Sequence, residues 1–131
     1  MWVRAVDTPA ETYALLEAHG IPTVLFLRPA EGHLDYVGIR NARTTAETTR
    51  HLVELGHARI AYLGGTDTAH VRTRRIAGYT ETMESLGLGP PIVWPSADGR
   101  QAGMKAMQDL RDVHPDVTAV VCNGDTVALG A

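Results

Sequence analysis

The sequence alternates short apolar runs, rich in β-branched residues, with longer stretches in which apolar residues recur every three or four positions. Runs of the first kind are typical of strands, and stretches of the second kind are typical of amphipathic helices. Regular alternation of the two predicts βα units around a parallel sheet, which is a three-layer α/β/α fold. The expected strands cover residues 23–27, 36–39, 59–63, 92–94 and 117–122, with helices between them.

The expected helices have recognisable starts and buried faces. Thr8 is the expected N-cap of helix 9–18. Ser96 or Asp98 is expected to cap the fourth helix. The run at 23–27 is apolar throughout, as expected of a strand that is buried on both faces. The three longest helices have apolar stripes at Ala42, Ala46, Thr49 and Val53, at Ile76, Tyr79, Met83 and Leu86, and at Gly103, Ala106, Met107, Leu110 and Val113.

Composition limits the class of protein. The 131 residues are 44% hydrophobic, which is enough apolar material for a core, and the net charge is −3. Direct DNA binders usually carry a basic face, so this charge balance argues against nucleic-acid binding by the chain itself. The single cysteine, Cys122, cannot form an internal disulfide, and neither a signal peptide nor an apolar run of membrane length is evident. We therefore expect a cytoplasmic protein that does not contact a membrane.

The last expected helix opens at residues 123–125 and has only about one and a half turns before the final residue. Helices this short do not stand alone, and no further strand follows to complete the sheet. We therefore interpret the chain as a truncated piece of a larger domain. A sheet left open in this way favours association between copies, so a homodimer is expected.

The loops that follow the strands indicate where a ligand would bind. Ligands of open parallel sheets bind beyond the carboxyl ends of the strands. In this sequence those ends lead into loops 40–41, 64–68, 95–98 and 123–125, which are rich in small and polar residues. Such loops suit a pocket that recognises its ligand by hydrogen bonds. The sequence therefore predicts a site for a small polar molecule at this edge of the sheet.

Three arginines, Arg72, Arg74 and Arg75, lie in the first two turns of the third expected helix. Positive charge there opposes the helix dipole, so a bound polar ligand or a facing carboxylate is expected to offset it. The fixed fork of guanidinium donors suits vicinal hydroxyls or a carboxylate. The alternative is a solvated helix face with surface ion pairs to Asp67 or Glu81.

Other residues that can carry chemistry have simpler explanations. Gly64-Gly65 lacks a phosphate-loop pattern and is expected to form a tight turn. His51 and His57 have no partner at metal-ligand spacing, so no metal site is expected. Trp94 is expected either to stack on a sugar or to pack within its strand. No nucleophile, base and orienting acid occur together in a motif, so neither catalysis nor a cofactor is expected.

Several motifs follow one another in a recognisable order. Residues 51–65, HLVELGHARIAYLGG, combine a helix that ends at an LGH turn with a strand of the type RIA-x-L-x-G. Residues 75–79, RIAGY, fit an R-x-x-G-aromatic element downstream. Further elements are GIPTVLFLR from Gly20, G-x-x-A-M at 103–107, PDVTAVV at 115–121 and CNGDTVALGA at 122–131. Together these motifs span nearly the whole chain and resemble the LacI/GalR family of bacterial transcription regulators.

The resemblance implies a fold like that of type I periplasmic binding proteins, with two lobes and an effector bound in the cleft between them. Residues 1–35 would form the end of the N-terminal lobe, and residues 36–131 most of the C-terminal lobe. The helix-turn-helix headpiece would lie outside this segment. The implied function is to sense a sugar or purine-like effector for a repressor that reaches operator DNA only through that headpiece.

The resemblance also implies particular ligand-binding residues. Arg75 matches the family's effector-binding arginine, and Asp125 matches an acidic residue that opens a helix. An asparagine often precedes that acid, and Gly124 stands in its place, so either Asn123 substitutes or the contact is lost. The aromatic that stacks on the ligand in several members falls near Asp98. The candidate ligand-binding residues are therefore Thr66, Arg75, Asp98, Asn123 and Asp125.

Departures from the family's pattern leave the identity of the effector open. Leu27 stands where an acid often precedes Arg28, and Arg40 stands where an aspartate commonly precedes Asn41. A solute-binding component of an uptake system has the same fold and is the alternative function, but it would need an export signal. An α/β enzyme would need a catalytic set of residues, which we do not find.

Overall fold

The computed structural model describes residues 2–4, 9–26, 34–65 and 70–131. Contacts divide the chain into two compact units, Met1–Arg40 with Ala69–Val71 and Asn41–Thr68 with Arg72–Ala131. None of the helices in the described ranges is long and apolar enough to cross a membrane.

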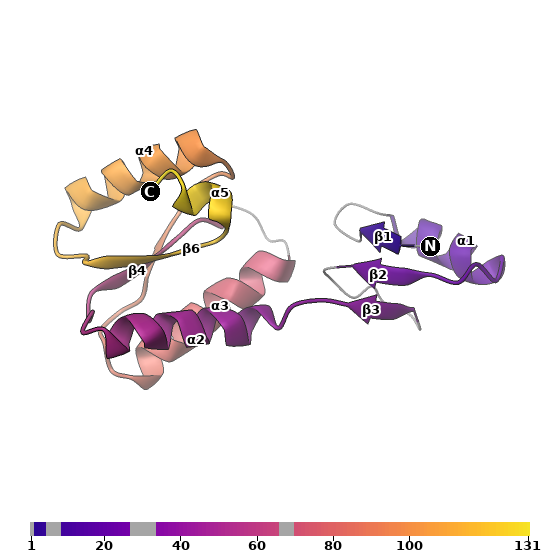
Figure 1. Ribbon diagram of the computed structural model, residues 1–131, viewed down its shortest axis with the longest axis horizontal. Helices are drawn as coiled ribbons and strands as arrows, with labels where there is room; N and C mark the ends of the chain where they lie inside the picture. The colour runs from indigo at the N-terminus through magenta and orange to yellow at the C-terminus, as the bar shows by residue number, and fades with distance from the viewer. Residues whose placement is uncertain (1, 5–8, 27–33, 66–69) are drawn as a thin grey trace. The chain divides into compact units, whose positions relative to one another are not determined.

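The first unit is built on a small parallel sheet (Figure 1). Strands β1 (Trp2–Arg4), β2 (Val24–Phe26) and β3 (Asp35–Val37) lie side by side in sequence order. The helix α1 (Ala10–Ala18) connects the first two strands. Tyr13 of α1 and Leu25 of β2 form the small core of this unit.

Two expectations for this part of the chain are wrong. The strand expected at 36–39 pairs with β2, so it belongs to the first sheet, and the first unit continues to Arg40. The strand β2 is not buried on both faces, because Phe26 is 46% exposed whereas Leu25 is fully buried. An apolar run by itself does not show how many faces of a strand are covered, since that depends on which helices pack there.

The second unit is a three-layer α/β/α sandwich, which confirms the predicted fold class. Its parallel sheet has the order β5–β4–β6, so β4 is the central strand. In Figure 1, α2 and α3 cover one face of this sheet, and α4 and α5 cover the other. In chain order the elements are α2 (Asn41–Glu54), β4 (Ile60–Leu63), α3 (His70–Ser85), β5 (Ile92–Trp94), α4 (Arg100–Val113), β6 (Ala119–Cys122) and α5 (Asp125–Ala128).

The central strand β4 separates two cores. All four of its side chains are buried, and they alternate between the two faces because successive side chains of a strand point in opposite directions. Burying a Leu or Ile side chain contributes about 1.5–3 kcal/mol, so both cores hold the layers together. The core on the α2–α3 side contains Ile60, Tyr62, Tyr79, Met83 and Val121, and the core on the α4–α5 side contains Ala61, Leu63, Ala106, Leu110 and Val127.

Two predicted apolar stripes extend too far. Leu86 and Val113 are 45% and 59% exposed. The reason is that α3 ends at Ser85, before Leu86, and that Val113 is the last residue of α4. At a helix end the chain turns away from the packed face, so periodicity no longer predicts burial.

The buried face of α2 is rotated relative to the predicted stripe. Asn41, Thr45 and Thr49 are the buried residues of this helix, whereas Ala42 and Ala46 are half-buried. Burial of the two threonines is tolerated because each hydroxyl donates to the carbonyl oxygen four residues earlier, at 3.0 and 2.8 Å. Polar residues can therefore replace apolar ones on this face.

The predicted cap of α4 is wrong. Gly99 precedes the helix and no side chain caps it. The hydroxyl of Ser96 donates to the carbonyl of Ala97 at 2.8 Å, and Asp98 forms an ion pair with an arginine of α3. The other expected cap, Thr8, lies outside the described residues.

Candidate functional site

The order of the strands singles out one position at the edge of the second sheet. From β4 the chain passes through α3 to β5 on one side of β4, and then through α4 to β6 on its other side. The helices that follow β4 and β6, which are α3 and α5, pack on opposite faces of the sheet (Figure 1). The chain therefore diverges at the carboxyl ends of β4 and β6. In open α/β sheets a ligand usually binds at this switch point.

Four polar residues from four different segments meet at this position. The Nε of Arg75 donates to Oδ1 of Asn41 at 2.9 Å, and Nη1 of Arg75 donates to the main-chain carbonyl of Asn123. The hydroxyl of Tyr62 donates to Oδ1 of Asn123 at 3.0 Å. This network connects the start of α2, the body of α3, strand β4 and the loop after β6. We refer to these four residues as the Arg75 network.

Gly64 allows the ends of β4 and β6 to come close together. A Cβ atom on Gly64 would lie 2.4 Å from the Cβ of Asn123, and its φ is +128°, a region that L-residues rarely adopt. The main-chain N–H of Asn123 donates to the carbonyl of Leu63 at 2.8 Å, which extends the strand pairing into the loop. Gly64 therefore serves a close strand-to-strand approach.

The electrostatics of the network keep Tyr62 as a hydrogen-bond donor. Burial raises the pKa of Tyr62 to about 12, although the positive charges of Arg75 and Arg72 act in the opposite direction. The phenol is therefore neutral at physiological pH and holds Oδ1 of Asn123 as an acceptor. Asn123 is only 6% exposed. Both of its oxygens, in the side chain and in the main chain, accept hydrogen bonds from protein groups.

The structure brings together two of the five candidate residues. Arg75 and Asn123 are in direct contact in the Arg75 network. Asp125 is exposed at the start of α5, where its Oδ1 accepts a hydrogen bond from the N–H of Thr126 at 3.0 Å. Thr66 lies outside the described residues.

The fourth candidate, Asp98, is paired with an arginine that the sequence assigned elsewhere. Its Oδ2 accepts from Nη2 of Arg72, whose side chain is 17% exposed. The sequence offered Asp67 or Glu81 as surface partners for the arginine cluster. Asp67 lies outside the described residues. The ion pair with Asp98 links α3 to the loop before α4.

Sequence reasoning missed two members of the Arg75 network. The sequence places Asn41 in the loop 40–41 and Tyr62 in the strand 59–63, and it indicates no partner for either side chain. A signal was available for Tyr62, because a tyrosine within a strand that is buried on both faces must find a partner for its hydroxyl. No comparable signal marked Asn41, because its partner Arg75 is 34 positions away in the sequence.

Two other expectations can be compared with the structure. The ring of Trp94 packs edge-on against that of His114, with centroids 5.7 Å apart, and Trp94 borders the core on the α4–α5 side. This arrangement supports packing within the strand for Trp94. In the ranges that the structure describes, no three His, Cys, Asp or Glu residues are grouped closely enough to hold a metal ion.

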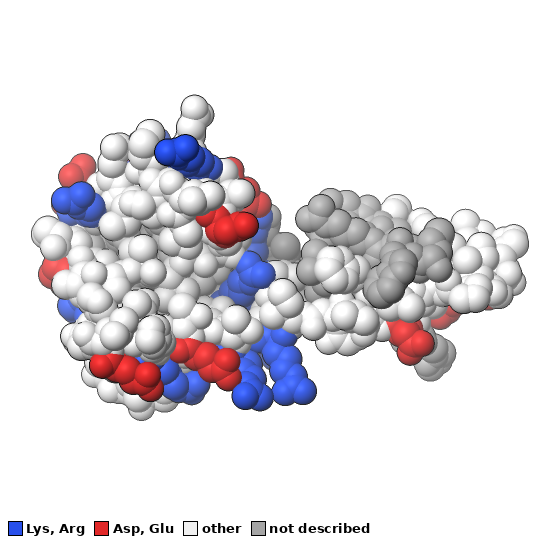
Figure 2. All heavy atoms as spheres, in the orientation of Figure 1, with Lys and Arg blue, Asp and Glu red and all other residues white. Residues whose placement is uncertain are grey.

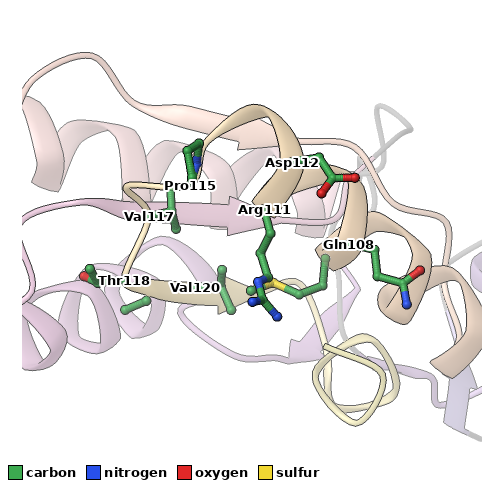
Figure 3. A pocket seen from close by; sticks show the side chains of 9 residues that line it. Gln108, Arg111, Asp112, Pro115, Val117, Thr118 and Val120 are labelled. Atoms are coloured by element: carbon green, nitrogen blue, oxygen red, sulfur yellow. The ribbon is translucent and has the colours of Figure 1, made fainter.

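A separate hollow of about 770 Å³ lies between α4 and the outer side of β6. Figure 3 shows Gln108, Arg111 and Asp112 of α4 on one side of it, and Val117 and Val120 on the other. None of the four candidate ligand-binding residues that the structure describes lines this hollow. β6 is at the end of the strand order of its sheet, so the hollow marks the open side of the sheet and not the switch point.

The visible surface of the second unit has no face of a single charge. Figure 2 shows acidic and basic side chains interspersed over it. Two ion pairs between residues four positions apart account for part of this pattern, Arg43 with Glu47 at 2.8 Å and Lys105 with Asp109 at 2.9 Å. Exposed pairs of this kind are screened by solvent, so they serve solubility more than stability.

Comparison with known proteins agrees with the motifs of the sequence. A family model described as "Periplasmic binding proteins and sugar binding domain of LacI family" matches residues 9–131. The maltose regulon regulatory protein MalI of Escherichia coli K12 is 31% identical over 120 residues, which are 89% of this chain and 35% of that protein. The regulator CelR of Thermobifida fusca is 32% identical over 122 residues, 89% of this chain and 36% of that protein. The chain thus spans about a third of the length of these relatives.

Solved structures share the fold. A LacI family regulator from Enterococcus faecium, solved with bound ribose, superposes with a TM-score of 0.86 over 98% of this chain and 49% of that one, at 22% identity. The Cra regulator of Pseudomonas putida, solved in complex with fructose 1-phosphate, has a TM-score of 0.82 over 98% of this chain and 49% of that one, at 21% identity. These likenesses confirm the fold that the motifs implied.

Proposed function

Because this chain belongs to the family of periplasmic binding proteins and sugar-binding domains of LacI regulators, we propose that it senses a small polar effector for a DNA-binding regulator, a repressor in our reading. The observation that supports this most directly is the Arg75 network at the switch point of the second sheet. A half-buried guanidinium held by two neighbouring segments is a pre-organised donor for a polar ligand. The ribose and fructose 1-phosphate in the relatives' structures support a sugar-sized effector.

Arg75 can respond to a ligand because it connects elements that are distant in sequence. Its side chain joins the first residue of α2 to the loop after β6. A ligand that binds the remaining guanidinium donors changes the balance of these bonds and therefore favours one arrangement of the segments over another. Such a difference in affinity between two arrangements is what a sensing domain requires.

Regulation then depends on parts outside this segment. We propose that operator DNA is contacted through a helix-turn-helix headpiece, and that the regulator acts as a homodimer in the cytoplasm. The first compact unit, which continues to Arg40, would belong to the first lobe, and the second unit to the second lobe. The net charge of −3 supports a sensing role in preference to direct DNA contact.

The alternative function is solute binding for an uptake system, which the same family description includes. The regulator assignment is favoured because the similar proteins MalI and CelR are themselves regulators. We also propose that the chain binds its ligand without catalysing a reaction, because these similar proteins are regulators. Thr66, Asp98, Asn123 and Asp125 remain proposed ligand-binding residues alongside Arg75.

A binding screen tests the proposal. The 131-residue chain is titrated with neutral sugars, sugar phosphates, sugar acids and purines, and binding is followed by amide NMR shifts and calorimetry. We expect saturable shifts at Arg75 and Asn123 for at least one compound. Arg75→Ala should weaken that binding by more than about 1.5 kcal/mol, the scale of a charged hydrogen bond. Arg74→Ala, on an exposed neighbour, is the matched control and should bind normally. A panel in which nothing binds, or equal affinities for Arg75→Ala and the parent chain, would contradict the proposal.

A further inference from the structure

An ion pair connects the two helix layers of the second unit at the carboxyl edge of the sheet. Nη2 of Arg72 donates to Oδ2 of Asp98. Arg72 lies in the first turn of α3, which follows β4, and Asp98 lies in the loop that joins β5 to α4. Because α3 and α4 cover opposite faces of the sheet (Figure 1), the pair passes over the ends of the strands from one layer to the other.

The two partners of this ion pair differ in their freedom to move. The side chain of Arg72 is 17% exposed, whereas that of Asp98 is 61% exposed. Burial raises the pKa of Tyr62, and the charges of Arg75 and Arg72 both oppose that rise, which places Arg72 close to the Arg75 network. A guanidinium held among packed groups keeps its place, whereas an exposed carboxylate on a loop exchanges its partner for water at little cost. The acid is therefore the partner that moves.

The loop that carries Asp98 has one fixed end and one end that can turn. At its start, the N–H of Gly64 donates to the carbonyl of Trp94 at 2.9 Å, and the next polar residue, Ser96, is only 6% exposed. At its other end, Gly99 has a φ of +114°, a conformation that glycine tolerates better than other residues. The ion pair of Asp98 thus holds the second half of the loop against α3.

We infer that the Arg72–Asp98 ion pair is a strap across the carboxyl edge of the second sheet. The strap is closed while the pair is formed, and it opens when Asp98 turns into water and the loop swings about Gly99. Local opening of this kind requires only that one weak link breaks. Because the strap adjoins the Arg75 network, its opening sets how fast a molecule reaches and leaves the switch point. The inference goes beyond the proposed function, since the strap is a property of the chain without ligand.

Amide hydrogen exchange of the ligand-free 131-residue chain tests the strap. The N–H of Gly103 donates to the carbonyl of Gly99 at 3.0 Å, so its exchange rate reports movement at the end of the loop. We expect Asp98→Asn to raise this rate by roughly three-fold or more, because the ion pair no longer limits opening. Raising the salt concentration from about 0.02 M to about 0.5 M should speed the exchange in the parent chain but not in Asp98→Asn, since salt screens a charge pair.

Further variants assign the effect to the ion pair. Arg72→Gln should speed the exchange of Gly103 as Asp98→Asn does, and the double variant should exceed neither single one, because both remove the same interaction. Asp98→Glu retains the charge and should exchange more slowly than Asp98→Asn. Asp109→Asn is the matched control, because it breaks an ion pair with Lys105 inside α4 and should leave Gly103 unchanged. The salt dependence of the parent chain provides a second measurement if a variant does not fold.

Binding rates test the control of access, and this part rests on the proposed function. The probes are ribose and fructose 1-phosphate, the ligands in the two solved structures. For a probe that binds, Asp98→Asn should raise the association and the dissociation rate constants together, by roughly three-fold, because an open strap eases both binding and release. Loss of a direct contact between Asp98 and the probe would instead raise the dissociation rate constant alone.

The exchange measurements decide the inference by themselves. If Gly103 exchanges equally fast in the parent chain and in Asp98→Asn, or if salt affects both alike, the strap is overturned. If the effects of Arg72→Gln and Asp98→Asn multiply in the double variant, the two residues act separately and the strap is also overturned. If only the dissociation rate constant changes, control of access is overturned. If neither probe binds, the exchange data still decide the strap, and the result counts against the proposed function.

Discussion

Replacing Gly78 by alanine should destabilise the second unit. Gly78 is buried in the middle of α3, where this helix meets α2. A Cβ atom there would lie 2.0 Å from the main-chain oxygen of Ala42. The obstacle is backbone and not the tip of a flexible side chain, so no change of rotamer relieves it. The helices must separate by about 1.4 Å to reach the 3.4 Å of an ordinary contact.

Two opposing effects determine how much Gly78→Ala changes the free energy of unfolding. Alanine in a helix interior is favoured over glycine by about 0.8–1.0 kcal/mol. Forcing an extra carbon into a packed interface costs about 1–3 kcal/mol, and an overlap with backbone belongs at or above the upper end of that range. We therefore expect a net loss of about 2 kcal/mol in the free energy of unfolding. At about 4 °C per kcal/mol for a chain of this length, the Tm should fall by about 8 °C.

Gly78→Ala should also alter the geometry of the candidate site. Asn41 is the first residue of α2, and its Oδ1 accepts from Arg75 at 2.9 Å. A displacement of α2 by more than an ångström lengthens this bond beyond hydrogen-bond distance. Gly78→Ala should therefore also weaken effector binding, without any substitution in the site.

Thermal and urea unfolding followed by circular dichroism provide the assay. Gly124→Ala is the control, because a Cβ at Gly124 would meet no atom within 4 Å and its φ of −165° is open to any residue. We expect that control to change stability by less than about 0.5 kcal/mol. A Gly78→Ala chain as stable as the Gly124→Ala chain would refute the close approach of α2 and α3.

Two further predictions concern single side chains. Tyr62→Phe should lower the free energy of unfolding in urea by about 1–3 kcal/mol, because Oδ1 of the buried Asn123 loses its donor. Burial also raises the pKa of Tyr62 from its ordinary value of 10.0 to about 12, so its stabilising contribution is complete below pH 10 and is lost as pH rises toward 12. The decline of stability in alkali should therefore be shallower in Tyr62→Phe, and identical slopes in the two proteins would contradict this. At the opposite end of the sheet, the hydrogen bond from Arg59 holds the pKa of Asp116 below its usual value of 3.8. That contribution is present above the usual value and is lost as pH falls through the lower folded pKa. Urea unfolding from about pH 5 down to pH 2 should show a weaker acid dependence for Asp116→Asn, and an unchanged acid limb would count against the ion pair.

Much of the candidate site could be anticipated from position in the chain. Arg75 drew attention because three arginines lie near the start of one helix, and Asn123 because it follows an expected strand. Their contact was not foreseeable, since it joins residues 48 positions apart. The same holds for Tyr62, whose hydroxyl reaches Asn123 across 61 positions. Partners of this kind depend on how strands are ordered, and strand order leaves no trace in local periodicity.

The class of fold follows from periodicity, which is a property of neighbouring residues. The alternation of strand-like and helix-like stretches was enough to predict a parallel sheet covered by helices, and the strand 92–94 appears at its predicted bounds. Folding in three dimensions decided the rest. It set β4 between β5 and β6, assigned β3 to the first sheet, and placed neutral oxygens around the Arg75 guanidinium. Pairing order and hydrogen-bond partners arise from competition among distant segments for the same positions, and only the folded chain resolves that competition.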